Sequence, residues 1–327
     1  MKAEHIQNRF LKLRSLAGIC LSALINFTSC LDEDLSNCQS EEGLIIKVVL
    51  STQNQQPEPT DISDVKMYIF DKEKCLLEMR STAIDKLEYL NYPGQDIKII
   101  VFANTGDQLL LTQPATNEHI DKGELSLKKA TVFANHDIYH TINDLLWGGL
   151  DIPNPVEPGV ERIFEIPARR ITPGVFIRIY GLDQYAGARG WNNSFAINLV
   201  AKYNKIDFYG NVSASETPIR YMPPLGRPTQ SDSDIWESPG GNNTNVKFFN
   251  IFSTDDGSPV SVDIYSGQDL VHTVSADSNG MPILAQNGQM CIIEIYFHSG
   301  GGNEGDITVN VTEAKWGYVP PIVQEFE

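Results

Sequence analysis

The sequence predicts an all-β protein of antiparallel sandwich type. Its apolar segments are short and rich in β-branched and aromatic residues, several of them alternate with a period of two, and Gly, Pro, Asn or Asp separates them. The 327 residues suffice for two domains, and 25 Gly with 18 Pro suit a turn-rich globular protein. We therefore expect two β-sandwich domains, at residues 43–170 and 171–327.

Residues 1–29 are typical of a secretory signal peptide. After a basic start, an apolar run of 12 residues extends from Leu16 to Phe27. A membrane-spanning helix needs about 20 residues, so this run fits the apolar core of a signal peptide better. Thr28 and Ser29 then precede Cys30, an order that resembles a bacterial lipobox. We expect Cys30 to be acylated and to begin the mature protein; the alternative is an ordinary signal peptide with an unmodified Cys30.

Residues 30–42 form an acidic tether after this cysteine, beginning with Leu31-Asp32-Glu33-Asp34. A run of acids is usually a solvated linker. In lipoproteins of some Gram-negative anaerobes, a similar stretch directs export to the outer face of the outer membrane. Both interpretations agree with a protein held at a membrane surface by a lipid.

The charge balance argues against nucleic-acid binding. The chain has 42 acidic against 25 basic residues and a net charge of -17. A protein that binds a duplex needs a cationic surface to release counterions from phosphate. We therefore predict no nucleic-acid partner.

Four segments in the first part of the chain predict strands: 43–51, 65–70, 97–103 and 175–180. Further along, alternating apolar residues predict three more half-buried strands. Their apolar faces are Val260, Val262 and Ile264; Ile293, Ile295 and Phe297; and Ile307, Val309 and Val311.

One short helix is expected at 137–146. Ile138, Ile142, Leu145 and Leu146 fall on one helical stripe, and Gly148-Gly149 follows as a stop signal.

We place the domain boundary between Arg169 and Pro173, after a proline-rich stretch and one strand. Residues 223–245 are interpreted as a long loop inside the second domain.

Catalytic chemistry has little support. His136 and His140 are four residues apart but without an HExxH pattern, and the chain has no GxSxG, P-loop or GxGxxG motif. Asp232-Ser233-Asp234 and Asp255-Asp256-Gly257 lack the spacing of an EF-hand loop. We predict neither an enzyme nor a cofactor.

Three cysteines remain after Cys20 and Cys30, which allows one disulfide among Cys38, Cys75 and Cys291 without indicating the pair.

The order of these segments resembles the fimbrillin-associated anchor proteins of Gram-negative anaerobes. The resemblance covers roughly 43–316 and is carried by short motifs in sequence: Asp34 to Cys38, Gly43-Leu44, Val65 to Asp71, Ile97 to Asn104, Leu146-Trp147-Gly148, and Ala314-Lys315-Trp316. It implies two transthyretin-like β-sandwich domains in a lipidated subunit. Such a subunit holds a fimbria to the outer membrane, limits its length and has a stalk fimbrillin as its partner.

An anchor must be distinguished from a stalk subunit of the same superfamily. In stalk subunits, as the family is understood, an arginine-specific protease removes the first strand, and a neighbour's strand fills the groove. This chain has no arginine between Cys30 and Arg80. The resemblance therefore implies a subunit that keeps both its first strand and its lipid.

The C-terminal residues are a candidate donor strand. Ile322, Gln324 and Phe326 would share one side of an extended strand, after Pro320 and Pro321, which lack amide donors. A frayed chain end is the other interpretation. The alternative function is a fimbrial tip adhesin or surface glycan-binding lipoprotein, for which the candidate aromatic residues are Tyr185, Trp191, Trp236 and Trp316.

Overall fold

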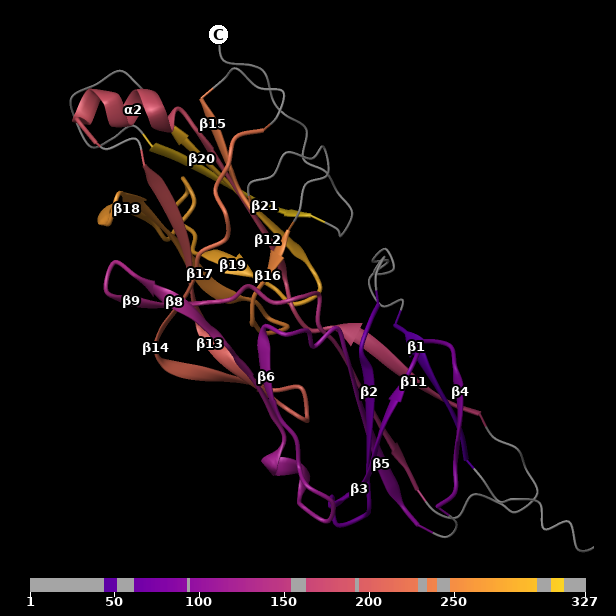
Figure 1. Cartoon of the computed structure of the whole chain (residues 1–327). Coiled ribbons are helices and arrows are strands. Elements are labelled where there is room, and N and C mark those ends of the chain that lie inside the picture. The colour runs from indigo at the N-terminus through magenta and orange to yellow at the C-terminus, as the bar shows by residue number, and fades with distance from the viewer. Residues whose placement is uncertain are drawn as a thin grey trace, which may run out of the picture.

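The chain folds into an elongated all-β molecule, which confirms the predicted fold class (Figure 1). The computed structural model describes residues 44–51, 62–92, 95–153, 163–191, 194–228, 234–239, 248–298 and 307–314. Its strands are β1 (Leu44–Leu50), β2 (Val65–Phe70), β3 (Leu76–Thr82), β4 (Leu87–Leu90), β5 (Ile97–Ala103), β6 (Leu109–Thr112), β7 (Glu124–Leu127), β8 (Lys129–Phe133), β9 (His136–Tyr139), β10 (Leu146–Ile152), β11 (Ile163–Arg170), β12 (Gly174–Tyr180), β13 (Phe195–Asp207), β14 (Val212–Tyr221), β15 (Ile235–Ser238), β16 (Phe249–Asn250), β17 (Ser258–Ser266), β18 (Asp269–Val274), β19 (Ile283–Ala285), β20 (Met290–Phe297) and β21 (Ile307–Ala314).

The strands predicted from composition and from periodicity are confirmed. The four segments of the first part form β1, β2, β5 and β12, and the three alternating segments form β17, β20 and β21. The expected apolar faces point into one large core cluster, in which Val262 and Ile293 are completely buried. Period-two alternation therefore identified both the strands and the faces that they bury.

A seven-stranded sheet forms one half of the molecule, in the order β3-β2-β5-β10-β11-β1-β4. It curls around a core of its own, since residues of β1, such as Ile46, and of β2, such as Met67, belong to the same buried cluster. The opposite face of β2 contributes Tyr68 and Phe70 to the larger cluster. The middle of this sheet is therefore buried on both faces.

A nine-stranded sheet joins strands from both sides of residue 170. Its main path is β18-β17-β13-β14-β9-β8, with β6, β7 and β19 attached beside it. Strands β6 to β9 precede residue 170 in the chain, whereas the others follow it. The division of the chain at residue 170 stays a prediction, and the shared sheet means that the two parts are bound together by main-chain hydrogen bonds.

Parallel pairs occur within sheets that are otherwise antiparallel. β1 pairs with β11, β12 with β20, and β14 with β9 in the parallel sense. The sequence predicted antiparallel sandwiches and gave no sign of these pairs. Parallel neighbours need long crossover connections, so no local turn signal marks them.

The helix predicted at 137–146 is wrong. Residues His136–Tyr139 form β9, Ile142 makes an isolated bridge to Asn250, and β10 begins at Leu146. The apolar residues are instead buried in different places, since Ile142 and Leu145 belong to the larger core cluster and Leu146 belongs to the cluster of the seven-stranded sheet. The loop expected at 223–245 also needs correction, because β15 (Ile235–Ser238) lies within it and pairs with β12.

The α-helix of the described residues, α2 (Leu182–Arg189), lies at the end of the molecule far from the seven-stranded sheet (Figure 1). Gly181 precedes it with a φ of 71°, and Gly190 follows it with a φ of 70°. A positive φ at these positions favours glycine, so the two glycines fix where this helix begins and ends.

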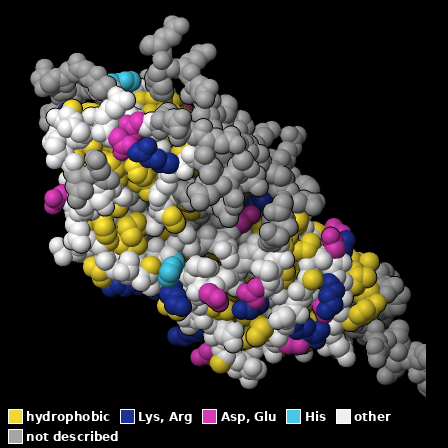
Figure 2. Space-filling view, turned by 45° about the horizontal axis from the view of Figure 1, so that its top comes forward, with side chains coloured by type: hydrophobic (Ala, Val, Ile, Leu, Met, Phe, Trp, Pro, Cys, Tyr) yellow, Lys and Arg dark blue, Asp and Glu magenta, His cyan; other side chains and the backbone are white. Residues whose placement is uncertain are grey.

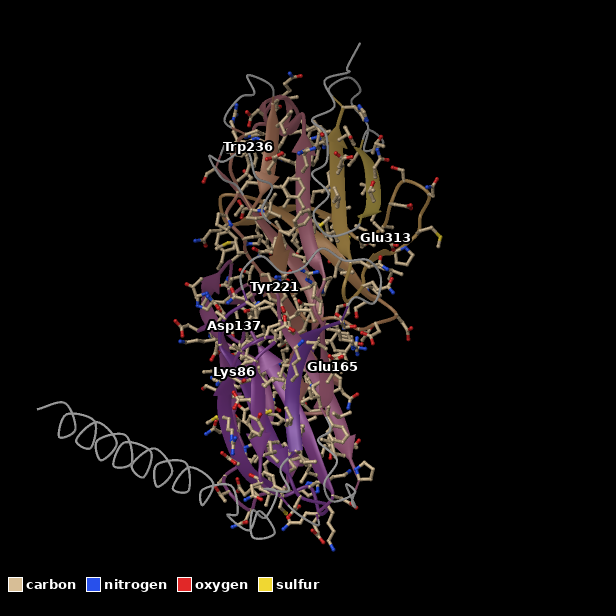
Figure 3. All side chains as sticks on the ribbon, turned by 90° about the vertical axis from the view of Figure 1, so that its right-hand side faces the viewer. Lys86, Asp137, Glu165, Tyr221, Trp236 and Glu313 are labelled. Carbon is tan, nitrogen blue, oxygen red and sulfur yellow. The ribbon has the colours of Figure 1, made fainter. Side chains whose placement is uncertain are left out.

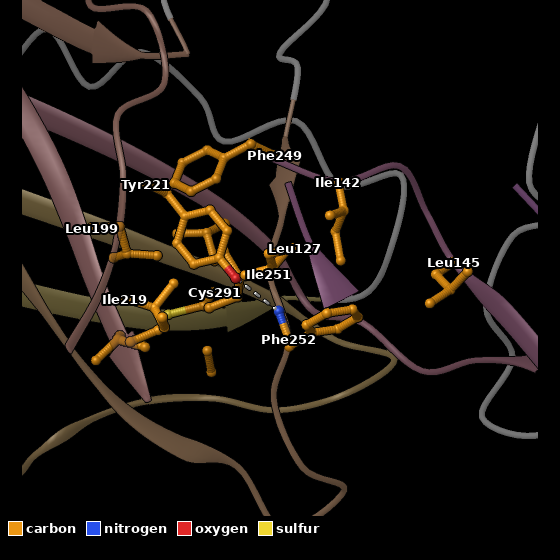
Figure 4. Packing of buried hydrophobic residues seen from close by; sticks show 14 of the residues in the cluster. Leu127, Ile142, Leu145, Leu199, Ile219, Tyr221, Phe249, Ile251, Phe252 and Cys291 are labelled. Carbon is orange, nitrogen blue, oxygen red and sulfur yellow. Dashed lines mark hydrogen bonds between the residues drawn. The ribbon is translucent and has the colours of Figure 1, made fainter. Parts of the chain in front are cut away.

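The larger core connects the sheets. Figure 4 shows part of it around Tyr221, whose hydroxyl accepts a hydrogen bond of 3.4 Å from the amide of Phe252. Burial raises the pKa of the Tyr221 hydroxyl, so this group remains protonated and polar inside an apolar cluster. Cys291 of β20 lies in the same cluster and is buried.

Candidate functional site

Several predicted site residues lie outside the part of the chain that the structure describes. They are the lipidation candidate Cys30, the donor-strand candidates Ile322, Gln324 and Phe326, and Trp316 and Cys38. Their roles stay predictions. The structure does describe the first strand, the arginine that follows it and the aromatic candidates around α2.

The first strand, β1, is held on both sides. It forms six parallel residue pairs with β11 and four antiparallel pairs with β4. Leu44, Ile46 and Val48 point into the core of the seven-stranded sheet, where they are at most 6% exposed. Burying each such side chain contributes about 1.5 to 3 kcal/mol, so removing the strand would expose a large apolar surface.

The outward side of β1 also makes specific contacts. Ile45 lies in register between Ile163 of β11 and Tyr89 of β4. Lys47 forms an ion pair of 2.9 Å with Asp85, and this hydrogen bond raises the pKa of the lysine ammonium. Since both faces of β1 have partners, the strand is an integral part of the sheet.

Arg80, the first arginine after Cys30, is tied down within β3. Its Nε and Nη2 donate to Glu78 at 2.5 and 2.9 Å, and its Nη1 donates to the main-chain oxygen of Tyr89 at 2.9 Å. Arg80 also pairs with Met67 in the β2–β3 ladder. Proteases cut most readily at exposed loop tips, so this arginine is a poor cleavage site.

The contact between Arg80 and Tyr89 joins the two outer strands of the seven-stranded sheet. Thr82 of β3 also donates to Glu88 of β4 at 2.7 Å, and Glu88 pairs with Lys86 at 2.6 Å. We call this junction the β3–β4 seam and define it by Glu78, Arg80, Thr82, Glu88 and Tyr89. On the face shown in Figure 2, hydrophobic and oppositely charged side chains alternate over the end that carries this sheet.

The seam holds its carboxylates in the charged form. The hydrogen bond from Arg80 keeps the pKa of Glu78 below its usual value, with the Tyr92 hydroxyl assisting. Burial and the bond to Glu78 raise the pKa of Tyr92 to about 12, which keeps this hydroxyl a donor. Burial opposes the charge on Glu88, but hydrogen bonds from Lys86 and Thr82 outweigh it and lower the pKa.

Three of the aromatic candidates for glycan binding gather near α2. Tyr185 packs against Trp191, with ring centroids 5.5 Å apart, and against Phe297 at 4.7 Å. Trp236 lies across the same region, where its Nε1 donates to Asp183 at 3.1 Å. Figure 3 places Trp236 near one end of the molecule, with Lys86 and Glu165 in the other half. Tyr185 is only 9% exposed and both tryptophans pack against the core, so these rings form no open stacking platform.

The remaining residues considered for metal binding or disulfide formation make ordinary structural contacts. Asp255 accepts from Arg169 at 3.1 Å and from Asn287 at 3.2 Å, and these bonds lower its pKa against the effect of burial. Cys75 and Cys291 are free thiols, so neither is bonded to the other. In the described part of the chain, no three His, Cys, Asp or Glu residues converge as a metal site. The helices found there are also too short to cross a bilayer.

Sequence reasoning missed the β3–β4 seam. The segment that forms β4 has only four residues and no clear alternation, so nothing marked it as a strand. The pairing of β4 with β1 and its approach to β3 depend on contacts between distant parts of the chain.

Comparisons with known proteins agree with this fold and organisation. The family model described as "Fimbrillin-A associated anchor proteins Mfa1 and Mfa2" matches residues 35–319. The major fimbrium anchoring subunit FimB of Porphyromonas gingivalis is 23% identical over 307 residues, which cover 90% of this chain and 91% of that protein. The structure of the fimbrial anchor protein Mfa2 from Porphyromonas gingivalis aligns with a TM-score of 0.55 at 14% identity, over 84% of this chain and 97% of that one. A candidate polysaccharide-binding protein from Bacteroides thetaiotaomicron aligns with a TM-score of 0.57 at 14% identity, over 84% of this chain and 96% of that one.

Proposed function

Because the chain belongs to the family of fimbrillin-A associated anchor proteins Mfa1 and Mfa2, we propose that it anchors a fimbria to the outer membrane through a lipid on Cys30 and limits the length of that fimbria. The observation that carries this proposal is the placement of β1 between β11 and β4. A subunit that stays attached through its N-terminus must retain its first strand, and the paired, buried β1 supports this.

The protection of Arg80 supports the same role. A stalk subunit, by the family resemblance, loses its first strand to an arginine-specific protease. Here the nearest arginine after Cys30 lies within β3, with its side chain bonded to Glu78 and Tyr89. The intact chain therefore suits an anchor, in which tether and first strand remain continuous.

Attachment to the stalk is proposed to use strand donation by the C-terminal residues. The described core ends with β21 at Ala314, and Ile322, Gln324 and Phe326 follow it in the chain. An extended segment that adds to a neighbour's sheet gains affinity from main-chain hydrogen bonds, and its alternating side chains determine register. The partner would be a stalk fimbrillin.

The glycan-binding or tip-adhesin alternative ranks second. The name of the Bacteroides thetaiotaomicron relative suggests polysaccharide binding for that protein, but the aromatic rings around α2 of this chain are packed into its core. We propose a structural rather than an enzymatic role.

Membrane fractionation tests the anchor. Full-length protein expressed in its native host should partition with outer-membrane detergent extracts, and mass spectrometry should find an acylated Cys30 as the first residue. Cys30→Ala should move the protein into the soluble fraction, whereas the control Cys75→Ala, at a partly exposed free thiol, should not. An unmodified N-terminus at another residue would refute the lipid anchor.

A further inference from the structure

The seven-stranded sheet closes through side chains rather than through main-chain pairing. β3 and β4 are its two outermost strands. Arg80 reaches across to the oxygen of Tyr89, and Thr82 reaches Glu88. No main-chain ladder joins β3 to β4 among the described residues. The β3–β4 seam is thus the place where this curled sheet stops short of a closed ring.

The register of β4 shows which of its main-chain groups face the seam. The carbonyl of Val48 accepts from the amide of Asp85, so the even-numbered residues of β1 bond toward β4. Their partners are Glu88 and Leu90. Main-chain groups alternate in direction along a strand, so those of Leu87 and Tyr89 point toward the seam. Over the described residues, they have no main-chain partner there.

Exposed apolar side chains border the same junction. Met79 of β3 is 40% exposed, and Leu87 and Tyr89 of β4 are 45% and 64% exposed. An edge strand with unpaired amides and apolar side chains is a template for another strand, and proteins usually protect such edges with charge or proline. Here Arg80 covers the Tyr89 carbonyl, and the other contacts between the two edges, Thr82 to Glu88 and Tyr92 to Glu78, join side chains and leave the remaining main-chain groups unpaired within the described part of the chain.

We propose that the β3–β4 seam accepts an extended strand from the fimbrial subunit that this anchor holds. The strand would pair with the outward main-chain groups of Leu87 and Tyr89 and place apolar side chains at alternate positions beside them. Arg80 would release the Tyr89 carbonyl and keep its pair with Glu78, and Thr82 would release Glu88. In the sequence, residues 52–61 connect β1 to β2 and residues 154–162 connect β10 to β11, and both segments are rich in polar residues and proline, so they match the required alternation poorly.

This inference rests on the anchoring function and adds a receiving surface to the proposed C-terminal donor. The two contacts differ in what this chain provides. At its C-terminus it would donate a strand, whereas at the β3–β4 seam it would offer an edge that receives one. A subunit that both gives and receives a strand would hold its partner at two places, and stable retention would need both contacts.

Charge placed on the edge tests the proposal in fimbriated cells. The double variant L87K/Y89K should retain at least tenfold less fimbrial subunit in pull-downs of the full-length, lipidated protein, a change of about 1.4 kcal/mol in binding. The matched control is Val132→Lys plus Leu270→Lys, two residues on other outer strands that are 57% and 53% exposed. Unchanged thermal unfolding verifies that each variant is folded.

A photo-crosslinking residue provides the second measurement. With p-benzoylphenylalanine at position 87, irradiation should join the anchor to a fimbrial subunit, and with the same residue at position 270 it should not. If L87K/Y89K retains as much fimbrial subunit as the wild-type protein and the lysine control, the seam proposal is wrong and the anchoring function stands. If wild-type protein retains none, the anchoring function itself fails. Should L87K/Y89K unfold, crosslinking at position 87 alone decides, and a crosslink only to a second copy of this chain would overturn the proposal.

Discussion

The indole Nε1 of Trp147 donates a hydrogen bond of 3.1 Å to the main-chain oxygen of Phe208. Trp147 belongs to β10 of the seven-stranded sheet, and Phe208 follows directly after β13 of the nine-stranded sheet. The Phe208 ring packs edge-on against Tyr68 and Phe102, with centroids 4.7 and 5.2 Å apart. This contact connects the two halves of the molecule.

Phe208→Ala should therefore lower the free energy of unfolding by about 3 to 5 kcal/mol, because the ring is fully buried and leaves a cavity between sheets. Urea unfolding followed by tryptophan fluorescence measures the change. Leu110→Ala, at a residue 52% exposed, is the control and should change stability little. A loss below 1 kcal/mol for Phe208→Ala would show that the two halves depend on other contacts.

The β3–β4 seam should weaken in acid. Arg80 lowers the pKa of Glu78 in the folded state, so the stabilisation by this carboxylate is present above the unfolded pKa, near 4.5, and is lost as pH falls through the folded value. Glu78→Gln should reduce stability at pH 7, and the difference from wild type should shrink toward pH 3. Urea unfolding at both pH values measures it, with Glu216→Gln on the exposed part of β14 as control. A difference that stays constant with pH would contradict the assigned ion pair.

The two free thiols should react very differently. Burial raises the pKa of Cys291 to about 12, so its reactive thiolate is scarce, whereas Cys75 is partly exposed. Iodoacetamide at pH 8 followed by peptide mapping should label Cys75 in the native protein and Cys291 only after denaturation. Rapid native labelling of Cys291 would mean that β20 opens more easily than its packing indicates.

The first strand should survive an arginine-specific protease. In the native mature protein, which is expected to begin at Cys30, we expect no cleavage before Arg80 and slow cleavage at Arg80, because this residue lies within the paired strand β3. Limited digestion followed by peptide mapping tests this, and heat-denatured protein is the control that should be cut at Arg80. Loss of residues 44–50 from the protein in assembled fimbriae would identify a stalk subunit instead.

The C-terminal donor should depend on one side of the strand. Deleting residues 321–327 should leave a folded, lipidated protein that no longer co-purifies with fimbriae. Ile322→Asp with Phe326→Asp should have the same effect, whereas Val323→Asp, on the other side of an extended strand, should be tolerated. If the truncated protein retains fimbriae at the wild-type level, attachment does not use this segment.

Local patterns predicted the strands well because burial on one face leaves a period of two, as in the first half of β17 and the second half of β20. The predicted helix at 137–146 failed because Ile138 and Ile142 pair with different parts of the chain, Ile138 with Arg220 of β14 and Ile142 with Asn250. The glycines taken as its stop signal lie inside β10, where a Cβ on Gly148 would come within 2.9 Å of the Pro167 oxygen.

Long-range pairing and the candidate site were less accessible to sequence reasoning. The arginine-free interval drew attention to Arg80, but the bonds of Arg80 to Glu78 and Tyr89 depend on the curl of the whole sheet. Likewise, no local signal relates β13 to β7, although Ile206 and Leu125 are paired.

The parallel pairing of β1 with β11 bears on how the molecule responds to mechanical force. If Cys30 is fixed to a membrane, drag on the fimbria pulls at the N-terminal end of β1, and we consider a pull directed along this strand. The six residue pairs with β11 and the four with β4 then carry the load at the same time. They do not separate one after another from one end of the strand. Forced unfolding depends on the barrier to this first rupture, so the order of strands in one sheet would set how long a fimbria stays attached under flow.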